Sequence, residues 1–517
     1  MIDFSLPSSF VGGFSDVTDV SCKSLGRILE GYPVLSREGQ EGIEISMVVC
    51  DSRKVVPGSM FVAISGTQSD GARYALDAAK RGAVAMVSES IIEPEDLLEG
   101  KGLALIRVED ARNALAIIAA RFYEHPSRSV KLIGVTGTNG KTTVTYLLES
   151  ILNGNGFSVG VIGTVDYRYG GQAFTAGMTT PESVDINRML SEMNGMGVSH
   201  CMLEVSSHAL TFQRIKGLEF GVTVFTNLSQ DHLDFHGTLE DYMLSKKSLF
   251  RDYPQDQRVV NVDDLLGREI FEEVPENTMT VGIHENADVR AENIRLERTG
   301  SYFNLKAPCG VLPVRSSLLG KHNVYNILSA AGAALQLGIS LDDIVSGINA
   351  LGAVPGRFEK VDCGQDFTVV VDYAHTEDAM SNILRAARSF TEGRILTVFG
   401  CGGDRDRGKR PKMGRVAVEA SDFAVVTSDN PRSEDPGKII EDIREGIPAY
   451  CGENERYVCV PERSEAIRLA IDRAGSGDFV IIAGKGHEDY QILNAETIHF
   501  DDREVAEKAL RVRLSLD

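Results

Sequence analysis

The stretch 130–143 constrains the fold more than any other part of the chain, and it reads Val-Lys-Leu-Ile-Gly-Val-Thr-Gly-Thr-Asn-Gly-Lys-Thr-Thr. The apolar run 132–135 predicts a buried strand, and the segment from Thr142 onward predicts an amphipathic helix. Between them lie Gly137 and Gly140, whose missing side chains let backbone N–H groups approach a phosphate closely. The order strand, glycine loop and helix is typical of a nucleotide-binding loop.

Two side chains at the end of this loop complete the prediction. Lys141 can neutralise terminal phosphates, and the Thr142 hydroxyl can ligate Mg²⁺. The loop is a variant, because Val135 stands where the usual spacing has glycine. We predict a nucleoside triphosphate site formed by Gly137, Thr138, Asn139, Gly140, Lys141, Thr142 and Thr143.

Length and charge limit the class of protein. A chain of 517 residues with 43% hydrophobic and 25% charged residues has room for about three globular domains. The net charge of -21 repels nucleic acid and anionic membranes, so we expect neither as a partner. The eight cysteines form no C-x-x-C pair, which favours reduced thiols. Without a recognisable signal peptide or membrane span, we expect a cytoplasmic protein, and a monomer.

Strand-like and helical segments alternate along most of the chain, which predicts an α/β fold with largely parallel sheets. We place a smaller α/β domain at 1–109, a central domain with a phosphate-loop sheet at 110–355, and a Rossmann-like α/β domain at 356–517. The turn Pro355-Gly356 marks the second boundary. In the last domain we predict parallel strands at 367–371, 395–399, 423–427 and 479–483.

Two polar segments beyond the phosphate loop suggest a metal site. Glu204 follows a strand-like run, where a carboxylate is well placed to hold Mg²⁺. The segment 226–237 contains Asp231, His232, Asp234 and His236. An ordinary polar loop remains the alternative for this segment, because Asp, Asn and His are common in loops.

Further candidate ligand groups lie past the middle of the chain. Arg357, presented from a turn, can bridge to phosphate oxygens, and Asp372, at a strand end, can accept from ribose hydroxyls. A capping Asp and a solvated Arg are the alternative. The loops 402–410, 428–432 and 484–488 each follow an apolar strand, which predicts binding of a polar, zwitterionic ligand.

These motifs together resemble the Mur ligase family. Gly-Thr-Asn-Gly-Lys-Thr-Thr, Glu-Val-Ser-Ser-His, Asp-His-Leu-Asp-Phe-His-Gly, Gly-Arg-Phe-Glu, Asp-Tyr-Ala-His-Thr, Asp-Asn-Pro-Arg and Gly-Lys-Gly-His-Glu occur in the family's order. The match runs from Asp51-Ser52-Arg53 to 484–491. Gln230 replaces the usual Arg and Glu377 the usual Pro, neither at a position with an assigned catalytic role.

The resemblance implies ATP-driven amide formation through an acyl phosphate in peptidoglycan precursor synthesis. It implies that Asn323 and Asn326 flank the adenine, and that Arg357 and Asp372 reach over ATP. It implies that Thr142 and Glu204 hold one Mg²⁺ while His232 helps hold another. From its spacing to His236-Gly237, Lys246 matches the family's carbamylated lysine. Lys247 beside it is expected to be solvated.

The resemblance also implies two further binding sites. Residues matching those that bind the UDP-muramoyl peptide are Ser52, Thr67, Gln68, Ser69, Thr179, Thr180, Ser206 and Arg214. Capping or turn roles are the alternative for each of them. Residues expected to bind the incoming diamino acid are Arg405, Asp429, Asn430, Pro431, Arg432, Gly484 and Glu488.

The diamino acid itself is predicted to be meso-diaminopimelate. Its distal carboxylate needs a fixed cation, and Arg432 can grip it bidentately. A surface pair of Arg432 with Glu434 or Asp435 is the alternative, and lysine or ornithine remain alternative substrates. Rival functions are folylpolyglutamate synthetase, for which Asp-Asn-Pro-Arg with Gly-Lys-Gly-His-Glu is not required, and a nucleotide-hydrolysing switch, which would release phosphate without any amino acid.

Overall fold

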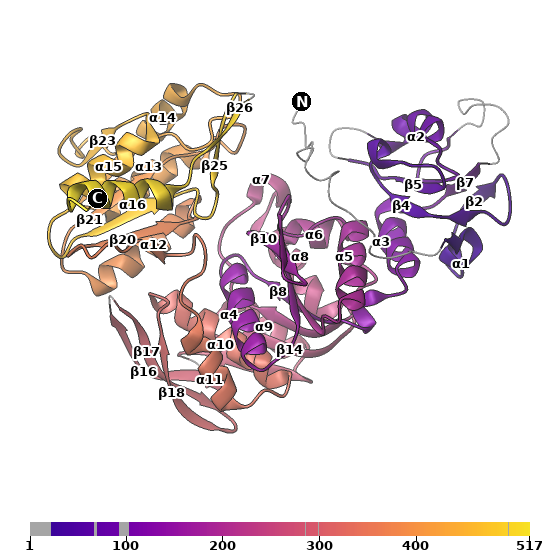
Figure 1. Ribbon diagram of the computed structural model, residues 1–517, viewed down its shortest axis with the longest axis horizontal. Coiled ribbons are helices and arrows are strands. Elements are labelled where there is room, and N and C mark those ends of the chain that lie inside the picture. Colours follow the sequence, from indigo (N-terminus) through magenta and orange to yellow (C-terminus); the bar gives the residue numbers. More distant parts are fainter. Residues whose placement is uncertain are drawn as a thin grey trace. The chain divides into compact units, whose positions relative to one another are not determined.

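The computed structural model describes residues 22–66, 70–92, 103–284, 286–297, 299–494 and 496–516. The chain divides into two compact units. The first comprises Met1–Thr136, Gly156–Val224 and Leu244–Arg258, and the second comprises Gly137–Asn155, Phe225–Met243 and Val259–Asp517. Figure 1 shows helices and strands alternating through both. No helix among the described residues is long and apolar enough to cross a bilayer.

A five-stranded sheet begins the first unit, in the order β2-β7-β6-β5-β4. Its strands are β2 (Ser36–Glu38), β4 (Met47–Val49), β5 (Ser59–Ala63), β6 (Ala85–Ser88) and β7 (Ala104–Arg107). All neighbouring pairs are parallel except β2 with β7. Helices α1 (Leu25–Leu29) and α3 (Ala111–Phe122) share one core with the sheet, and α2 (Ala75–Arg81) shares another. A short pair, β1 (Lys23–Ser24) with β3 (Glu44–Ile45), completes this region.

The largest sheet has 11 strands, in the order β11-β10-β9-β12-β8-β13-β14-β15-β16-β17-β18. Strands β8 (Lys131–Thr136), β9 (Val159–Ile162) and β12 (His200–Glu204) are parallel neighbours. The other strands are β10 (Asp166–Tyr169), β11 (Gln172–Thr175), β13 (Phe220–Phe225), β14 (Gln255–Asn261), β15 (Thr278–Gly282), β16 (Val289–Glu297), β17 (Gly300–Ala307) and β18 (Gly310–Ser316). The strand predicted before the phosphate loop is therefore confirmed as β8.

Helices surround this sheet within each unit. They are α4 (Lys141–Gly154), α5 (Ser183–Gly195), α6 (Ser207–Thr211), α7 (Leu233–His236), α8 (Leu239–Arg251), α9 (Leu265–Glu273), α10 (Lys321–Gln336) and α11 (Leu341–Ala350). Helix α4 packs on α10 and α11, and the Ser150 hydroxyl donates to the Gly347 carbonyl at 2.7 Å. A Cβ at Gly347 would lie 2.5 Å from the Ile151 Cα, so this crossing requires a residue without a side chain.

The C-terminal sheet has the order β19-β20-β24-β21-β22-β23. Its strands are β19 (Glu359–Lys360), β20 (Thr368–Asp372), β21 (Ile395–Phe399), β22 (Phe423–Val426), β23 (Tyr457–Cys459) and β24 (Phe479–Ala483), all parallel except β19. The four predicted strands are confirmed.

Helices cover both faces of this sheet. Alternate residues of β20 point to opposite cores: Val370 to that of α12 (Glu377–Phe390), α13 (Lys409–Ala420) and α14 (Pro436–Arg444), and Val369 to that of α15 (Arg463–Arg473) and α16 (Asp502–Arg513). Strands β25 (Tyr490–Leu493) and β26 (Glu496–His499) form a separate hairpin.

The prediction of largely parallel sheets missed the antiparallel part of the large sheet. Strands β9, β10 and β11 pair antiparallel, and so do β16, β17 and β18. Strand β10 and most of β17 alternate partly buried and buried residues. The sequence prediction relied on continuous apolar runs, which mark parallel strands buried on both faces but not half-buried antiparallel ones.

Candidate active site

The phosphate loop closes tightly over its own backbone. Gly137 and Gly140 have φ values of 147° and 90°, in the left-handed region that favours glycine. A Cβ at Gly140 would lie 2.2 Å from Asn326 Oδ1, and one at Gly137 would lie 1.9 Å from Thr226 Oγ1. Lys141, the first residue of α4, donates from Nζ to the Gly137 and Thr138 carbonyls at 2.9 and 3.0 Å. The loop therefore places a cation at the N-terminus of a helix, where an anion is favoured.

Residues of the predicted polar segment 226–237 hold this loop in place. The Asn139 carbonyl accepts hydrogen bonds from the Thr226 hydroxyl at 2.6 Å and from Asn227 Nδ2 at 3.1 Å. The Asn227 side-chain oxygen in turn accepts from the Asn139 N–H at 3.0 Å. Thr138 Oγ1 lies 3.0 Å from the Tyr242 hydroxyl. Part of the segment thus supports the nucleotide loop directly.

The two asparagines predicted to flank adenine lie beside the same loop. Asn323 and Asn326 are buried in α10, and Asn326 Nδ2 donates to Asn323 Oδ1 at 2.9 Å. Asn323 Nδ2 donates to the Leu319 carbonyl at 2.8 Å. Since Asn326 also meets Gly140, the structure brings α10 and the phosphate loop together, as the prediction requires.

Arg357 also reaches the phosphate loop. Its Nη2 donates to Thr142 Oγ1 at 3.2 Å, and its guanidinium lies 4.7 Å from the centre of the Tyr373 ring. The turn predicted at Pro355-Gly356 is confirmed. A guanidinium beside the first turn of α4 is placed to contact phosphate oxygens.

Asp372 holds the turn that carries Arg357. Its carboxylate accepts from the N–H groups of Phe358 at 2.7 Å and Ala374 at 2.8 Å. Burial raises the pKa of Asp372, and the nearby Arg357 opposes that rise. Asp372 does not cap a helix, since Thr376 is the N-cap of α12, and the ribose contact remains a prediction.

Glu204 lies in the first unit at the end of β12 and is 1% exposed. Its carboxylate accepts from the Thr164 N–H at 3.0 Å and from the Thr164 hydroxyl at 2.8 Å. Thr164 Oγ1 also lies 3.1 Å from Thr179 Oγ1. Thr164, which the sequence analysis did not single out, therefore helps to hold the buried carboxylate. Its position after β9 in Ile162-Gly163-Thr164 was the available signal, since loops after parallel strands carry ligands.

Four of the residues predicted to bind the muramoyl peptide lie together in the first unit: Thr179, Thr180, Ser206 and Arg214. Thr180 Oγ1 donates to the Glu204 carbonyl at 2.7 Å and accepts from the Ser206 N–H at 3.0 Å. Ser206 caps α6, as its alternative role proposed. Arg214 donates to the Thr180 carbonyl at 3.0 Å and pairs with Glu182.

Lys246 and Lys247 are both buried, at 1% and 8% exposure. The expectation that Lys247 is solvated is therefore wrong, because α8 turns both side chains away from water. In the second unit, His232 has a φ of 53° and its Nε2 lies 3.4 Å from Asp231 Oδ2. Among the described residues, no group of three or more His, Cys, Asp or Glu side chains gathers as a metal site.

The loops predicted to bind the amino acid meet at the carboxyl ends of β21, β22 and β24. Asn430 Nδ2 donates to Glu488 Oε2 at 2.8 Å, which joins the second loop to the third. A Cβ at Gly402 would lie 2.9 Å from Arg432 Nη1 and 3.7 Å from Arg405 Cγ, so both arginines flank Gly402. Pro431 is buried beside them, and Gly484 has a φ of 116°.

Arg432 does not make the surface pair that was its alternative. Its Nη1 donates to the Gly403 carbonyl at 2.9 Å and the Asn430 carbonyl at 3.4 Å. Glu434 is engaged instead by the fully buried Arg410, whose Nη2 lies 2.8 Å from Oε1. That pairing lowers the pKa of Glu434 to about 2. In the part of the chain that the structure describes, no carboxylate lies within salt-bridge distance of Arg432 or Arg405.

Carboxylates lie near the two arginines. Burial raises the pKa of Glu488, the neighbouring Asp429 raises it further, and Lys485 lowers it. For Arg405, partial burial and the nearby Arg432 lower the pKa. The loops therefore place two guanidinium groups and two carboxylates around one space, which suits a zwitterionic ligand.

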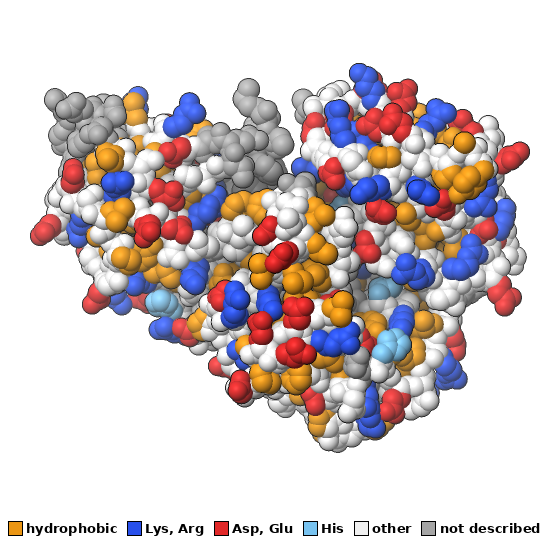
Figure 2. Space-filling model, turned by 180° about the vertical axis from the view of Figure 1, so that it is seen from behind, with side chains coloured by type: hydrophobic (Ala, Val, Ile, Leu, Met, Phe, Trp, Pro, Cys, Tyr) orange, Lys and Arg blue, Asp and Glu red, His pale blue; other side chains and the backbone are white. Residues whose placement is uncertain are grey.

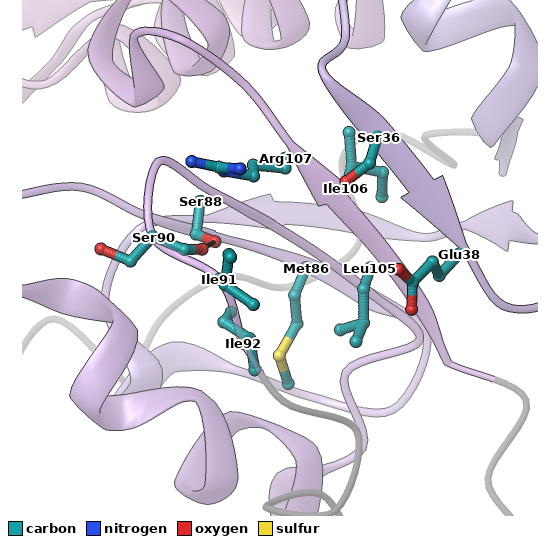
Figure 3. Close-up of a pocket in the computed structure, with 10 residues that line it drawn as sticks. All are labelled: Ser36, Glu38, Met86, Ser88, Ser90, Ile91, Ile92, Leu105, Ile106 and Arg107. Atoms are coloured by element: carbon teal, nitrogen blue, oxygen red, sulfur yellow. Dashed lines mark hydrogen bonds between the residues drawn. The ribbon is translucent and has the colours of Figure 1, made fainter.

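The other residues predicted to bind the UDP-muramoyl peptide are only partly described. Ser52 is buried, and Asp51 caps the short helix η2 (Ser52–Lys54) by accepting from the Arg53 N–H. Thr67, Gln68 and Ser69 lie outside the described residues. A separate cavity of about 140 Å³ lies along β6 and β7, lined by hydroxyls, apolar side chains and Arg107 (Figure 3), and it contains none of the predicted site residues.

All eight cysteines are free thiols, as predicted. On the face shown in Figure 2, basic and acidic side chains are interspersed, without one extended basic patch.

Comparison with known proteins identifies the class. Three family models match the chain in succession: the Mur ligase family catalytic domain at 44–123, the Mur ligase middle domain at 135–334, and the Mur ligase glutamate ligase domain at 356–486. The chain therefore belongs to the Mur ligase family, and it is an ATP-dependent acid–amino-acid ligase that forms ADP. The resemblance seen in its motifs is confirmed.

Full-length relatives carry one more specific name, UDP-N-acetylmuramoyl-L-alanyl-D-glutamate–2,6-diaminopimelate ligase. The protein from Clostridium botulinum is 44% identical, over 90% of this chain and 95% of the relative. That from Solibacter usitatus is 45% identical, over 90% and 94%.

Solved structures agree. One ligase of that name is 32% identical with a TM-score of 0.68, covering 96% of this chain and 100% of its own. A MurF ligase from Thermotoga maritima in complex with ADP, 20% identical with a TM-score of 0.60, covers 90% of this chain and 98% of its own and shares the fold.

Proposed function

We propose that this ligase adds meso-diaminopimelate to UDP-N-acetylmuramoyl-L-alanyl-D-glutamate in the cytoplasm, acting as a monomer. Relatives about 44% identical carry that name. The observation that carries the proposal is the pair Arg405 and Arg432, which flank Gly402 beside Asn430 and Glu488.

This pair separates diaminopimelate from lysine by charge. Lysine ends in an ammonium, whereas diaminopimelate adds a carboxylate at the same end. A pocket for lysine would leave the Arg432 guanidinium half-buried without an anion, which costs free energy. Diaminopimelate offers a carboxylate to Arg432 and an ammonium to Glu488 and the Gly484 carbonyl. Arg405 is then left for the carboxylate at the reacting end.

The reaction proceeds in two steps. A carboxylate oxygen of the D-glutamate attacks the γ-phosphorus of ATP, which forms an acyl phosphate and releases ADP. The free amine of diaminopimelate then attacks the acyl carbon, phosphate leaves, and the amine loses a proton as the amide forms. Lys141, at the N-terminus of α4, stabilises charge on the transferred phosphoryl group, and Arg357 contacts the phosphates beside Thr142.

The donor chemistry of Thr142 and Glu204 fits Mg²⁺, because a hydroxyl and a buried carboxylate are hard oxygen ligands. His232 and a carbamate on Lys246 are the proposed ligands of a second ion. Bound there, Mg²⁺ would neutralise charge on the phosphate oxygens. Burial of Lys246 supports a role inside the protein rather than at a solvated surface.

The carbamate is tested by Lys246→Ala with Lys247→Ala as its neighbour control. We expect Lys246→Ala to abolish ligation and short carboxylic acids to restore part of it. Mass measurement of native protein at raised bicarbonate should show the added CO₂ in wild type only. Full activity of Lys246→Ala would exclude a carbamate ligand at this position.

The substrate is tested by measuring ADP release and amide product together. The purified protein is given ATP, the UDP-muramoyl dipeptide, and either meso-diaminopimelate, L-lysine or L-ornithine. We expect ADP release to depend on the dipeptide and product to form with diaminopimelate. Faster ligation of lysine would overturn the proposed specificity. ADP release without any acceptor would favour a hydrolysing switch, and ligation of glutamate to a folate would favour folylpolyglutamate synthetase.

A further inference from the structure

A fully buried ion pair lies directly behind the proposed amino-acid pocket. Arg463 is the first residue of α15 and Asp502 the first of α16, on the same face of the C-terminal sheet (Figure 1). Both side chains are 0% exposed. Arg463 Nε lies 2.7 Å from Asp502 Oδ1 and Nη2 lies 2.6 Å from Oδ2, which is a bidentate pair.

The remaining donors of Arg463 reach the two loops. Nη1 donates to the Ser428 carbonyl at 3.2 Å, and Nη2 donates to the Ala483 carbonyl at 3.0 Å. Ser428 immediately precedes the loop 429–432, and Ala483 immediately precedes the loop 484–488. One planar guanidinium therefore binds the backbone at the start of both loops and fixes the distance between these two points.

The loops themselves depend on that distance. Asn430, in one loop, reaches Glu488, in the other, at 2.8 Å. A Cβ at Gly484 would lie 2.6 Å from Asp429 Oδ2, so the two loops approach closely just beyond Arg463. A shift of one strand end against the other would open these contacts together.

Stability alone does not explain the pair. A buried ion pair costs the hydration of both charges, and well-packed apolar residues often replace one without loss of stability. The position of the pair, in contrast, affects the site directly. The positive charge of Arg463 lies near enough to attract the carboxylates of Asp429 and Glu488. The pair therefore supplies position and a positive field to the two carboxylates that face a distal ammonium.

We propose that Arg463 and Asp502 are positioning residues that set the spacing of the loops 429–432 and 484–488, and thereby the discrimination between diamino acids. This inference rests on the proposed function for the identity of the amino acid. Neither residue touches the substrate. Their role is to hold Arg432 on one loop and Glu488 on the other at a separation that fits one side-chain end.

A second arginine–aspartate pair in the same sheet provides a control, in which Asp478 is buried and Arg394 is exposed. Arg394 and Asp478 immediately precede β21 and β24, so they join the amino ends of strands whose carboxyl ends carry the pocket. Arg394 Nη2 lies 2.6 Å from Asp478 Oδ2. Disturbing this pair should destabilise the domain without changing the spacing of the loops.

The experiment compares Arg463→Lys with Arg394→Lys in the full-length protein. For each variant, we measure Tm, the KM values for ATP, for the dipeptide and for meso-diaminopimelate, and the ratio of kcat/KM for diaminopimelate over lysine. We expect Arg463→Lys to raise the KM for diaminopimelate about tenfold and to lower the ratio, with the KM for ATP within about twofold. Arg394→Lys should lower Tm and leave the ratio unchanged.

A double variant keeps the test decisive if Arg463→Lys does not fold. Arg463→Met with Asp502→Leu removes both charges and fills their volume with apolar side chains. This variant should have a Tm near that of wild type, but a lower ratio of kcat/KM for diaminopimelate over lysine. The proposal would be overturned if a folded Arg463 variant kept the wild-type ratio of kcat/KM for diaminopimelate over lysine. It would also be overturned if Arg394→Lys lowered that ratio equally. If wild type ligates another diamino acid, the proposed function fails, and the same measurements on that amino acid decide the positioning role separately.

Discussion

The phosphate loop and the amino-acid loops, both in the second unit, are held by different means. The phosphate loop is fixed by its own glycines and by the uncharged side chains of Thr226 and Asn227, which donate to the Asn139 carbonyl. Lys141 folds onto the Gly137 and Thr138 carbonyls. The amino-acid loops are fixed by buried charges supplied from elsewhere in the domain: Arg410 holds Glu434, and Arg463 holds the carbonyls before both loops.

This difference separates general from selective recognition. Every ATP-using member of a family can share the same phosphate loop, because the loop contacts only the phosphates. Choice among amino acids that differ by one carboxylate requires guanidinium groups at set positions, and those positions depend on distant residues. We therefore expect changes in the first region to reduce the reaction with every amino acid, and changes in the second to alter the choice of amino acid.

The largest effect is expected for Lys141→Ala. Removing this cation leaves the transferred phosphoryl group without its side-chain counter-charge, so acyl phosphate formation should fall about 1000-fold. Trapping of the acyl phosphate by reduction or hydroxylamine measures that step without the amino acid. If the loss appeared only when diaminopimelate was added, the contrast between the two regions would be wrong.

The next effect is expected for Arg432→Ala. Loss of a charged, bidentate contact should raise the KM for diaminopimelate about 100-fold, or about 2.7 kcal/mol, and leave acyl phosphate formation near its normal rate. Arg407→Ala is the control, because Arg407 is exposed and pairs with Glu434 outside the pocket. An equal rise in both variants would show that loop integrity, not the Arg432 contact, determines affinity.

A smaller effect is expected from pH acting on Glu488. Because burial raises its pKa, Glu488 takes up a proton at a higher pH than a surface glutamate does. The neutral acid attracts the distal ammonium less, so the KM for diaminopimelate should rise about tenfold as pH falls through that raised pKa. For stability the sign is opposite: the folded protein binds this proton more tightly, so the contribution of Glu488 is lost as pH rises through its folded pKa.

The KM for ATP over the same pH range serves as the reference. Glu488→Gln, which cannot titrate, should remove the extra dependence seen with diaminopimelate. A Gln variant whose KM for diaminopimelate still rose with acidification would assign the titration to another group of the pocket.

The same difference between the phosphate loop and the amino-acid loops explains how much of each the sequence predicted. The strand, loop and helix around Lys141 are contiguous, so local pattern was sufficient for β8 and α4. The amino-acid loops were predicted because each follows a strand, but the residues that hold these loops in place were not predicted. Arg463 and Asp502 are 39 residues apart in sequence, each at the start of a different helix, so no local pattern pairs them. Only the folded sheet brings them to Ser428 and Ala483.

Some predicted roles also depend on packing that no pattern shows. Lys247 was expected in solvent because a lysine following another lysine on a helix usually faces water, yet it is buried. The ribose contact of Asp372 stays a prediction, but the sequence did not show that its oxygens also accept from two backbone N–H groups. In both cases the contacts of the side chain depend in part on residues that are distant in sequence.

The smallest effect is expected for Gly402→Ala. A Cβ there would lie 2.9 Å from Arg432 Nη1, the far end of a flexible side chain, so the guanidinium can yield by a few tenths of an ångström. We expect the KM for diaminopimelate to rise about threefold, the KM for ATP to stay constant, and Tm to change little. Gly140→Ala is the comparison, because its Cβ would lie 2.2 Å from the buried Asn326 Oδ1 at a φ of 90°, where alanine is also strained. That variant should lose ATP binding with every amino acid tested. If Gly402→Ala instead reduced activity as much as Gly140→Ala does, the amino-acid loops would be as rigid as the phosphate loop. The Arg432 side chain would then be unable to shift away from the added methyl group.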